Sequence, residues 1–260
     1  MASSNDRISK VLLVAIVLCL VCSVVVSSAA VLLRDAQQAN KALDMKRNIL
    51  AAAGMLEPGV SVEEQFKRVE TRAINFETGE FTDAVNAATY DQRKAAKAPE
   101  TSEALDGEED IAGINRQEKY GLVYLVYEGD RLDKVILPVR GYGLWSTLYG
   151  FLALESDLNT VAGLGFYEHG ETPGLGGEVD NPLWKAKWHG KQVYEPGDFG
   201  DVQLSVVKGE VDPQAPNAQY KVDGLSGATL TSKGVDQLIK FWLSEQGYAQ
   251  FLTNLKSGEA

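Results

Sequence analysis

An uncharged apolar run over residues 11–33 constrains the fold of this chain more than any other feature. Its 23 residues are mostly Leu, Val, Ile and Ala, which is long enough to cross a bilayer as a tilted helix. The run therefore predicts a single transmembrane helix. A cleaved signal peptide is the alternative, because Arg7 and Lys10 precede the run and residues 27–30 resemble a cleavage site. A signal core has about 7–15 apolar residues, so the length favours a retained anchor.

Charge does not decide on which side of the membrane the rest of the chain lies. Basic residues flank both ends of the span: Arg7 and Lys10 before it, and Arg34, Lys41, Lys46 and Arg47 after it. The positive-inside rule therefore favours neither orientation. Cys19 and Cys22 both lie within the span, so the remainder has no disulfide and no thiolate metal site on either side.

Composition excludes several classes of partner and site. A net charge of −11 at pH 7 argues against binding to nucleic acid and against docking on anionic lipid. The two histidines, His169 and His189, are too few and too far apart in sequence to indicate a metal centre. Paired carboxylates at residues 108–110 lie in a charged stretch, where exposure to solvent explains them. We therefore expect no metal centre in this chain.

The chain divides into three predicted segments: an N-terminal segment with the span over 1–34, a helical linker and charged insertion over 35–118, and a globular domain over 119–260. Helical spacing over 35–53 predicts that the membrane helix continues into water until Gly54. A capping box at Ser61 predicts a second helix to about residue 71. Residues 87–113 are charged and are expected to form a peripheral insertion or a flexible cover.

The core of the globular domain is expected to begin near Tyr120. Alternating apolar runs separated by turn residues predict two hairpins, 120–127 with 132–139 and 146–155 with 160–167. Further predicted elements are a helix at about 181–188, a strand over 202–211, a helix from 231 to about 246, and a short helix over 248–255. Antiparallel hairpins with helices segregated to the ends indicate an α+β fold, a transmembrane helix followed by an antiparallel-sheet domain with flanking helices.

Residues 223–233 place a threonine, Thr229, in a loop of small residues just before an amphipathic helix. The first N–H groups of a helix and the positive end of its dipole favour an anion, and Gly227 and Ala228 allow that anion to approach the backbone. Lys233 adds a positive charge one turn beyond the threonine. The spacing lacks the G-x-x-x-x-G-K-[ST] pattern of a nucleotide-binding P-loop.

A capped helix is the alternative explanation of the same residues. Thr229, Thr231 and Ser232 are all suitable N-cap residues, and Asp223 is suited to closing an Asx turn. Two other glycine-rich loops stand at predicted strand ends, Gly-Tyr-Gly-Leu-Trp-Ser at 141–146 and His-Gly-Glu-Thr-Pro-Gly-Leu-Gly-Gly at 169–177. Glycines at such positions allow main-chain groups to face a ligand, although turn formation alone also explains them.

Together these strings resemble the FMN-binding domain family. The resemblance rests on Asp-x-x-Ser-Gly-Ala-Thr at 223–229 and Glu-Thr-Pro-Gly-Leu-Gly at 171–176, in an order that follows one membrane span. The longer string Gly-Tyr-Gly-Leu-Trp-Ser-Thr-Leu-Tyr-Gly-Phe-Leu-Ala-Leu-Glu at 141–155 is similar to the C subunits of Na+-translocating NADH:quinone reductases. The G subunits of Rnf electron-transport complexes share the two short motifs. The similarity extends over essentially the whole chain.

The resemblance implies a covalent FMN, esterified through its phosphate to Thr229 and installed from FAD by a separate flavin transferase. It implies that aromatic and apolar side chains lie against the ring while polar and backbone groups hold its edge and the phosphate. The implied cofactor-binding residues are Tyr142, Gly143, Trp145, Glu171, Thr172, Leu175, Gly176, Ser226, Gly227, Ala228, Leu230 and Lys233. Two roles stay open for Asp223, orienting the loop or binding the metal that the transferase uses.

The resemblance also implies a role within a larger assembly. A member of this family relays single electrons between an iron–sulfur centre and a second covalent flavin on a neighbouring membrane subunit, and the complex couples NADH oxidation by ubiquinone to Na+ export. The chain has no dinucleotide fingerprint and is not catalytic alone. By analogy its soluble domain faces the periplasm at a bacterial inner membrane. An Rnf-type carrier and a cofactor-free, membrane-tethered binding or assembly module are the alternatives.

Overall fold

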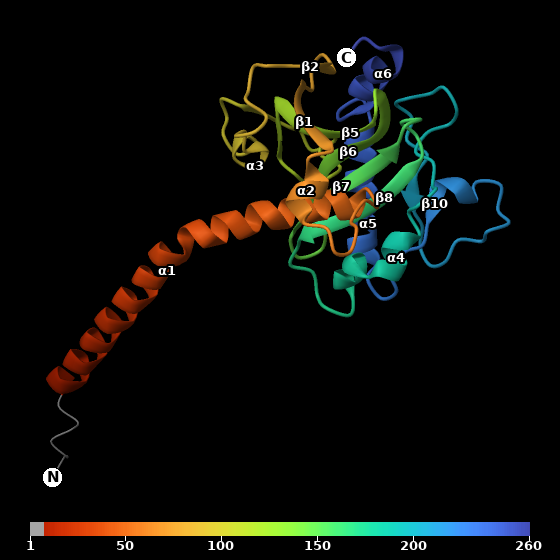
Figure 1. Ribbon diagram of the computed structural model, residues 1–260. Helices are drawn as coiled ribbons and strands as arrows, with labels where there is room; N and C mark the ends of the chain where they lie inside the picture. The colour runs from red at the N-terminus through yellow and green to blue at the C-terminus, as the bar shows by residue number, and fades with distance from the viewer. Residues whose placement is uncertain (1–7) are drawn as a thin grey trace. The chain divides into compact units, whose positions relative to one another are not determined.

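The computed structural model describes residues 8–260 (Figure 1). The chain forms two units, one up to Met45 and one from Lys46 to Ala260. The first unit is the N-terminal part of helix α1 (Ile8–Ala52), whose apolar segment is long enough to cross a membrane and is not buried by the protein itself. The predicted span and its helical continuation are thus one helix. Arg7, one of the basic residues that flank the span, lies outside the described residues.

The second unit contains the end of α1, which packs on a β-sheet. Ile49, Leu50 and Ala52 are buried there in a cluster with residues of the sheet. Gly163 in the sheet allows this contact, because a Cβ there would clash with the Ala52 carbonyl. Gly54, at φ +67°, ends the helix as expected, and the following N–H donates back to the Leu50 carbonyl over 2.8 Å.

A six-stranded antiparallel sheet forms the centre of the unit, in the order β2-β1-β5-β6-β7-β8. Both predicted hairpins are present, as β5–β6 and β7–β8. The fold is α+β, as the sequence indicates. The strands are β1 (Val69–Asn75), β2 (Glu80–Phe81), β5 (Tyr120–Glu128), β6 (Arg131–Tyr142), β7 (Thr147–Glu155) and β8 (Val161–Glu168).

The expectation that the core begins near Tyr120 is wrong. β1 pairs with β5 along its whole length, from Val69 opposite Val126 to Asn75 opposite Tyr120. Helix α2 (Val62–Phe66) does begin at the capping box, where the Ser61 hydroxyl accepts from the Glu64 N–H at 3.3 Å. It ends before residue 71, however, because pairing with β5 and burial of Val69 and Ala73 draw the following residues into the sheet.

The charged insertion is fastened to the sheet. It contains α3 (Gln92–Ala95) and a two-stranded ribbon of β3 (Ser102–Ala104) and β4 (Arg116–Glu118). Glu118, 1% exposed, accepts hydrogen bonds from Gln92 and from Arg140 of β6, each at 2.5 Å. This buried ion pair links the insertion to a central strand.

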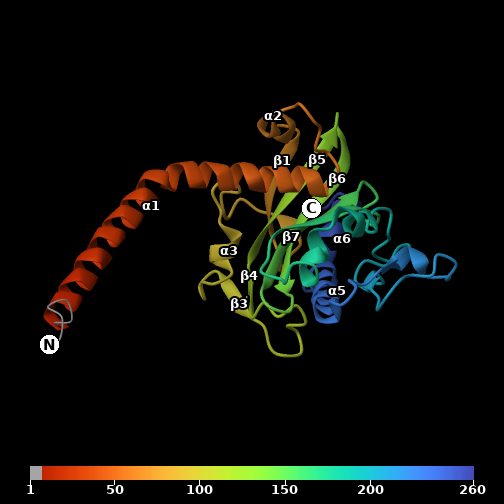
Figure 2. The same ribbon diagram turned by 90° about the horizontal axis from the view of Figure 1, so that it is seen from below.

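The two faces of the sheet are covered by different helices (Figure 2). Val123 and Leu125 of β5 belong to the cluster that also contains α5 (Thr229–Leu243) and α6 (Ala249–Ser257). Their neighbour Tyr124 belongs to the cluster of α2 and the end of α1. Such alternation is the two-residue period of a strand buried on both faces. The predicted apolar face of α5, Val235, Leu238, Ile239, Trp242 and Leu243, is buried.

The region between β8 and α5 differs most from expectation. A 3-10 turn, η1 (Gly176–Asp180), leads into α4 (Pro182–Ala186), shorter than the predicted helix. The expectation of a strand over 202–211 is wrong for all but two residues. These form β9 (Ser205–Val206), which pairs in parallel with β10 (Lys221–Val222). The chain leaves the extended path after β9 at Gly209, whose φ is +85°. The excursion returns through the turn η2 (Ala218–Tyr220).

Candidate functional site

The three glycine-rich loops converge at the N-terminal end of α5. Glu171 of the second loop joins the other two, since its Oε1 accepts from the Trp145 N–H at 2.9 Å and its Oε2 from the Thr231 hydroxyl at 2.6 Å. The Gly170 N–H donates to the Ser146 hydroxyl at 2.6 Å. Three segments that are distant in sequence thus form one structure around a single carboxylate.

Glu171 is 5% exposed and carries more hydrogen bonds than any other carboxylate of the site. Burial raises the pKa of its carboxyl, but the hydrogen bonds from Thr231 and from the N–H groups of residues 144–146 outweigh burial and hold the pKa below its ordinary value. The group is therefore ionised at neutral pH. Its oxygens are engaged within the protein, so this residue braces the loops.

Two glycines of the predicted site allow the loops to pack around the Glu171 carboxylate. A Cβ at Gly143 would lie 2.7 Å from Glu171 Oε1, and one at Gly176 would lie 2.5 Å from Thr231 Oγ1. Both separations are too short for ordinary contacts, so only glycine lets the loops reach the carboxylate. Gly227 has a φ of +72° and its missing Cβ faces Leu175 at 3.1 Å, which brings the second and third loops together.

The capped-helix explanation of the threonine loop is wrong. Thr229 is the first residue of α5, Ala228 occupies the N-cap position, and no side chain in the described chain caps this helix. Thr231 instead donates to Glu171, and the Ser232 hydroxyl accepts from the Leu225 N–H at 2.8 Å. The first N–H groups of a 15-residue helix are therefore left for an anion at Thr229.

Asp223 does not close a local Asx turn. Its Oδ1 accepts from the N–H of Val211 at 2.8 Å, twelve residues earlier, and its Oδ2 pairs with Lys187. Burial raises the pKa of the Asp223 carboxyl. The Lys187 ammonium and the Val211 N–H lower it by more than burial raises it, so the pKa lies below its ordinary value.

A cavity of about 190 Å³ adjoins Thr229. Lys233 lines it, as expected, and so does Lys208 from the excursion after β9, which sequence reasoning missed. Neither lysine forms an ion pair within residues 8–260. Asp236, also in the wall, is already held by Lys240 at 2.8 Å and by the Val206 N–H at 2.8 Å. The cavity thus offers a positive environment beside a hydroxyl. Lys208 carried no sequence signal because residues 202–211 were predicted to be a strand.

Four large apolar side chains of the same loops are exposed: Tyr142 at 49%, Trp145 at 66%, Leu175 at 45% and Leu230 at 57%. Exposed apolar side chains that lie together at one end of a domain are typical of a binding surface. Thr172 and Ser226 are exposed there as well, whereas Ala228 is buried. The structure therefore brings the twelve predicted contact residues and Thr229 to one end of the domain. Their contact with a cofactor stays a prediction.

The two histidines take part in structural contacts. His169 Nε2 lies 2.8 Å from Asp180 Oδ2, and His189 Nδ1 lies 3.0 Å from the Ala162 carbonyl. The described residues contain no group of three or more His, Cys, Asp or Glu side chains arranged to hold a metal ion.

Comparison with known proteins places this chain within one family. A model of the FMN-binding domain matches residues 143–244, from the first glycine loop to the end of α5. The C subunit of the Na+-translocating NADH-quinone reductase of Pseudomonas aeruginosa is 55% identical, over 99% of this chain and 100% of its own length. The chain belongs to the family of C subunits of Na+-translocating NADH-quinone reductases, the NqrC family. The Yersinia pestis member is 46% identical over 98% of this chain and 96% of its own.

Solved structures of the NqrC family share the fold. The crystal structure of NqrC from Shewanella oneidensis superposes with a TM-score of 0.75 at 37% identity, covering 82% of this chain and 97% of its own. That of the Parabacteroides distasonis member has a TM-score of 0.64 at 31% identity, covering 85% and 97%. The α+β domain is therefore the family's fold, and the matched FMN-binding domain contains the second and third site loops and residues 143–146 of the first.

Proposed function

We propose that this chain carries FMN covalently, through an ester between the FMN phosphate and the Thr229 hydroxyl. The observation that carries the proposal is the position of Thr229 at the uncapped start of α5, beside two lysines and two residues before Thr231, which Glu171 ties to the other loops. Attachment forms the bond between Thr229 Oγ1 and the flavin-side phosphorus of FAD. It breaks the pyrophosphate bond and releases AMP, with the hydroxyl proton lost to solvent or to the transferase.

The phosphate fits the residues present. A phosphodiester carries one negative charge, which the helix N-terminus favours and which Lys208 and Lys233 neutralise from the cavity wall. The nearby carboxylates already have partners, because Asp236 is bound to Lys240 and Asp223 to Lys187. The local charge is positive although the whole chain has a net charge of −11.

The ring fits the exposed apolar residues. Trp145, Tyr142 and Leu175 lie on loops that Glu171 and the glycines fix, so their side chains offer planes for an isoalloxazine. The backbone of residues 172–177 offers polar groups at the ring edge, where it turns through Gly174 at φ +75°. The flavin supplies one-electron chemistry, and the protein positions it and sets its electrostatic surroundings.

The family resemblance supports our proposal for the role in the cell. The chain acts as an electron-carrier subunit of a multi-subunit Na+-translocating NADH:quinone reductase, between an iron–sulfur centre and a second flavin on a neighbouring membrane subunit. The apolar part of α1 anchors it in the bacterial inner membrane, with the domain in the periplasm where the flavin transferase works. The relatives' names support the reductase, and nothing in this chain favours the ferredoxin-linked Rnf alternative.

Flavin fluorescence of the denatured, washed chain tests the covalent link. The full chain is produced with a flavin transferase, and Thr229→Ala is compared with the parent and with Thr231→Val, which removes a neighbouring hydroxyl. We expect fluorescent parent and Thr231→Val bands and a dark Thr229→Ala band. A dark parent band would favour the cofactor-free binding module, and a fluorescent Thr229→Ala band would move the attachment elsewhere.

A further inference from the structure

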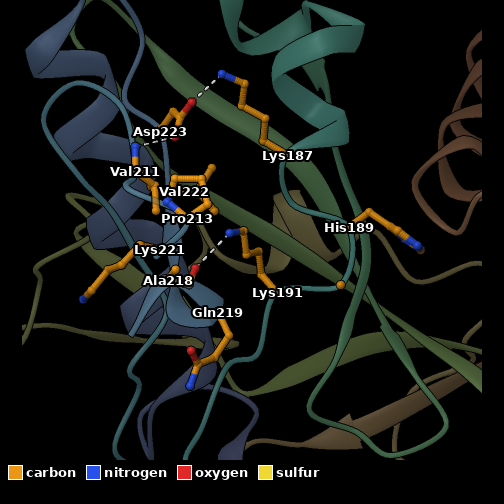
Figure 3. Close-up of a pocket in the computed structure, with 11 residues that line it drawn as sticks. Lys187, His189, Lys191, Val211, Pro213, Ala218, Gln219, Lys221, Val222 and Asp223 are labelled. Atoms are coloured by element: carbon orange, nitrogen blue, oxygen red, sulfur yellow. Dashed lines mark hydrogen bonds and ion pairs between the residues drawn. The ribbon is translucent and has the colours of Figure 1, made fainter. Parts of the chain in front are cut away.

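Asp223 stands at the start of the attachment loop and binds two segments that are distant in sequence (Figure 3). Its Oδ2 forms an ion pair with Lys187, at the end of α4, and its Oδ1 accepts from the Val211 N–H at 2.8 Å. Its own carbonyl accepts from Trp184 Nε1 at 2.8 Å. The residue is therefore held by three contacts before the chain reaches Thr229.

The segment that carries Lys208 is joined to the residues around Asp223. The Val207 N–H donates to the Val222 carbonyl at 2.9 Å, and the Gly224 N–H donates to the Gly209 carbonyl at 2.9 Å. Lys208 lies between these two hydrogen bonds, and the Asp223–Val211 bond adds a third just beyond them. The position of Lys208 beside Thr229 thus depends on the residues around Asp223.

A cavity of about 460 Å³ separates α4 and the residues that follow it from the excursion at 211–223. Two lysines cross it: Lys187 reaches Asp223, and Lys191 Nζ donates to the Ala218 carbonyl at 2.9 Å (Figure 3). His189 and Lys221 point away from this gap in Figure 3. Of the two lysines, only Lys187 contacts the attachment loop. Lys191 therefore provides a matched control of equal charge in the same cavity.

We infer that Asp223 is a positioning residue, whose carboxylate fastens the attachment loop to α4 through Lys187 and holds the Lys208 segment through Val211. The Asp223–Lys187 ion pair holds the Thr229 hydroxyl, Lys208 and Lys233 in the arrangement that accepts the phosphate before FMN is attached. The inference rests on the proposed function of Thr229. A ligand role toward the transferase's metal would have to compete with these two contacts, since each carboxylate oxygen of Asp223 already has a partner.

The test measures the initial rate of covalent FMN incorporation into the purified full chain by a flavin transferase, with FAD and a divalent cation. Asp223→Asn and Lys187→Met should each slow incorporation by about ten- to a hundredfold, because small misplacement of a reacting group has effects of this size. The double variant should be no slower than the slower single variant, since both remove the same contact. Lys187→Arg should restore most of the rate, and Lys191→Met should leave it within about twofold.

Cation dependence separates positioning from metal binding. If Asp223 positions the loop, its loss lowers the maximal rate and leaves the cation concentration for half-maximal rate unchanged. A rise in that concentration for Asp223→Asn, with a normal rate for Lys187→Met, would overturn the inference in favour of the metal ligand. Unchanged rates for both variants would overturn it outright.

Two further measurements keep the outcome interpretable. The Tm of each unlabelled variant should stay within a few degrees of the parent, because the Lys187 side chain is 46% exposed and Asp223→Asn preserves shape. A parent chain that acquires no FMN would refute the proposed function of Thr229. A parent labelled at Thr229 together with a fully active Lys187→Met would leave that function standing and refute only the role of Asp223.

Discussion

Two carboxylates hold the two sides of the site by different means. Glu171, on the side proposed for the flavin ring (the ring side), is buried and is satisfied by three backbone N–H groups and a hydroxyl. Asp223, on the side proposed for the phosphate (the phosphate side), is 17% exposed at its side chain and is satisfied by one N–H and a half-exposed lysine. The ring side is thus a frame of neutral donors around a buried carboxylate, whereas the phosphate side depends on an ion pair that solvent reaches.

The difference follows from what each side must do. Loops that place aromatic planes need a fixed arrangement, and hydrogen bonds from backbone groups with little freedom supply it. Under the proposed function a second enzyme must reach the attachment loop, and an ion pair at the surface orients such a loop with less desolvation. The comparison predicts that damage to the Glu171 frame lowers folding stability, while damage to the Asp223 pair lowers attachment.

The largest expected effect on stability is that of Glu171→Ala. It leaves three partly buried N–H groups and the buried Thr231 hydroxyl without an acceptor, which should lower the free energy of unfolding by about 3 kcal/mol. Urea unfolding of the full chain in detergent measures the change, with Asp223→Ala as the matched variant. A decrease in the free energy of unfolding for Glu171→Ala that is no larger than that for Asp223→Ala would contradict the predicted difference between the two sides.

Gly176→Ala should have the next largest effect. Its Cβ would lie 2.5 Å from Thr231 Oγ1 and 2.8 Å from Glu171 Oε2, so the loops must move apart at a cost of roughly 1–3 kcal/mol. Gly107, where nothing lies within 4 Å of a new Cβ, provides the control substitution to alanine. Equal unfolding midpoints for the two variants would show that the loops are not closed around Glu171.

Acid should weaken both sides. The folded pKa values of Glu171 and Asp223 lie below their ordinary values of 4.5 and 3.8, so each contributes stability that is present at neutral pH. That stability is lost as the pH falls from these ordinary values through the lower folded pKa values. In urea titrations, the difference between the parent and Glu171→Gln should therefore be constant above about pH 6 and shrink below about pH 4. A stability difference that grows as the pH falls would contradict the direction of the pKa shift at Glu171.

Salt should produce the smallest effect and should affect only one side. The Lys187–Asp223 pair is partly exposed, so raising the ionic strength to about 0.5 M should reduce the rate difference between the parent and Lys187→Met by about twofold. The stability difference between the parent and Glu171→Gln should not change, because its partners are neutral. A salt response at Glu171 equal to that at Lys187 would remove the distinction between the two sides.

Sequence patterns predicted the elements whose signals are local. The hairpins β5–β6 and β7–β8 follow from alternation and turn residues, and the buried face of α5 follows from helical spacing. β1 was missed because a capping box marks where a helix starts and not where it ends. Its membership of the sheet depends on β5, which lies far along the chain.

The site was predicted in its parts and not in its connections. Thr229, the three loops and Lys233 were identified from residue types and a family resemblance. That Glu171 would direct its carboxylate at the first loop and at α5 depends on folded loops, which periodicity does not describe. Lys208 was missed for a similar reason, because a short parallel pair and Gly209 turn an apparent strand into a loop beside Thr229.

The central claim is that Thr229 is the point of attachment. Peptide mass spectrometry of the segment over 223–233, from full chain isolated with its native membrane, tests it most directly. We expect the mass of FMN on Thr229 and none on Thr231 or Ser232, whose hydroxyls are buried and bonded to Glu171 and to the Leu225 N–H. An unmodified segment, or FMN on either neighbouring hydroxyl, would contradict the account.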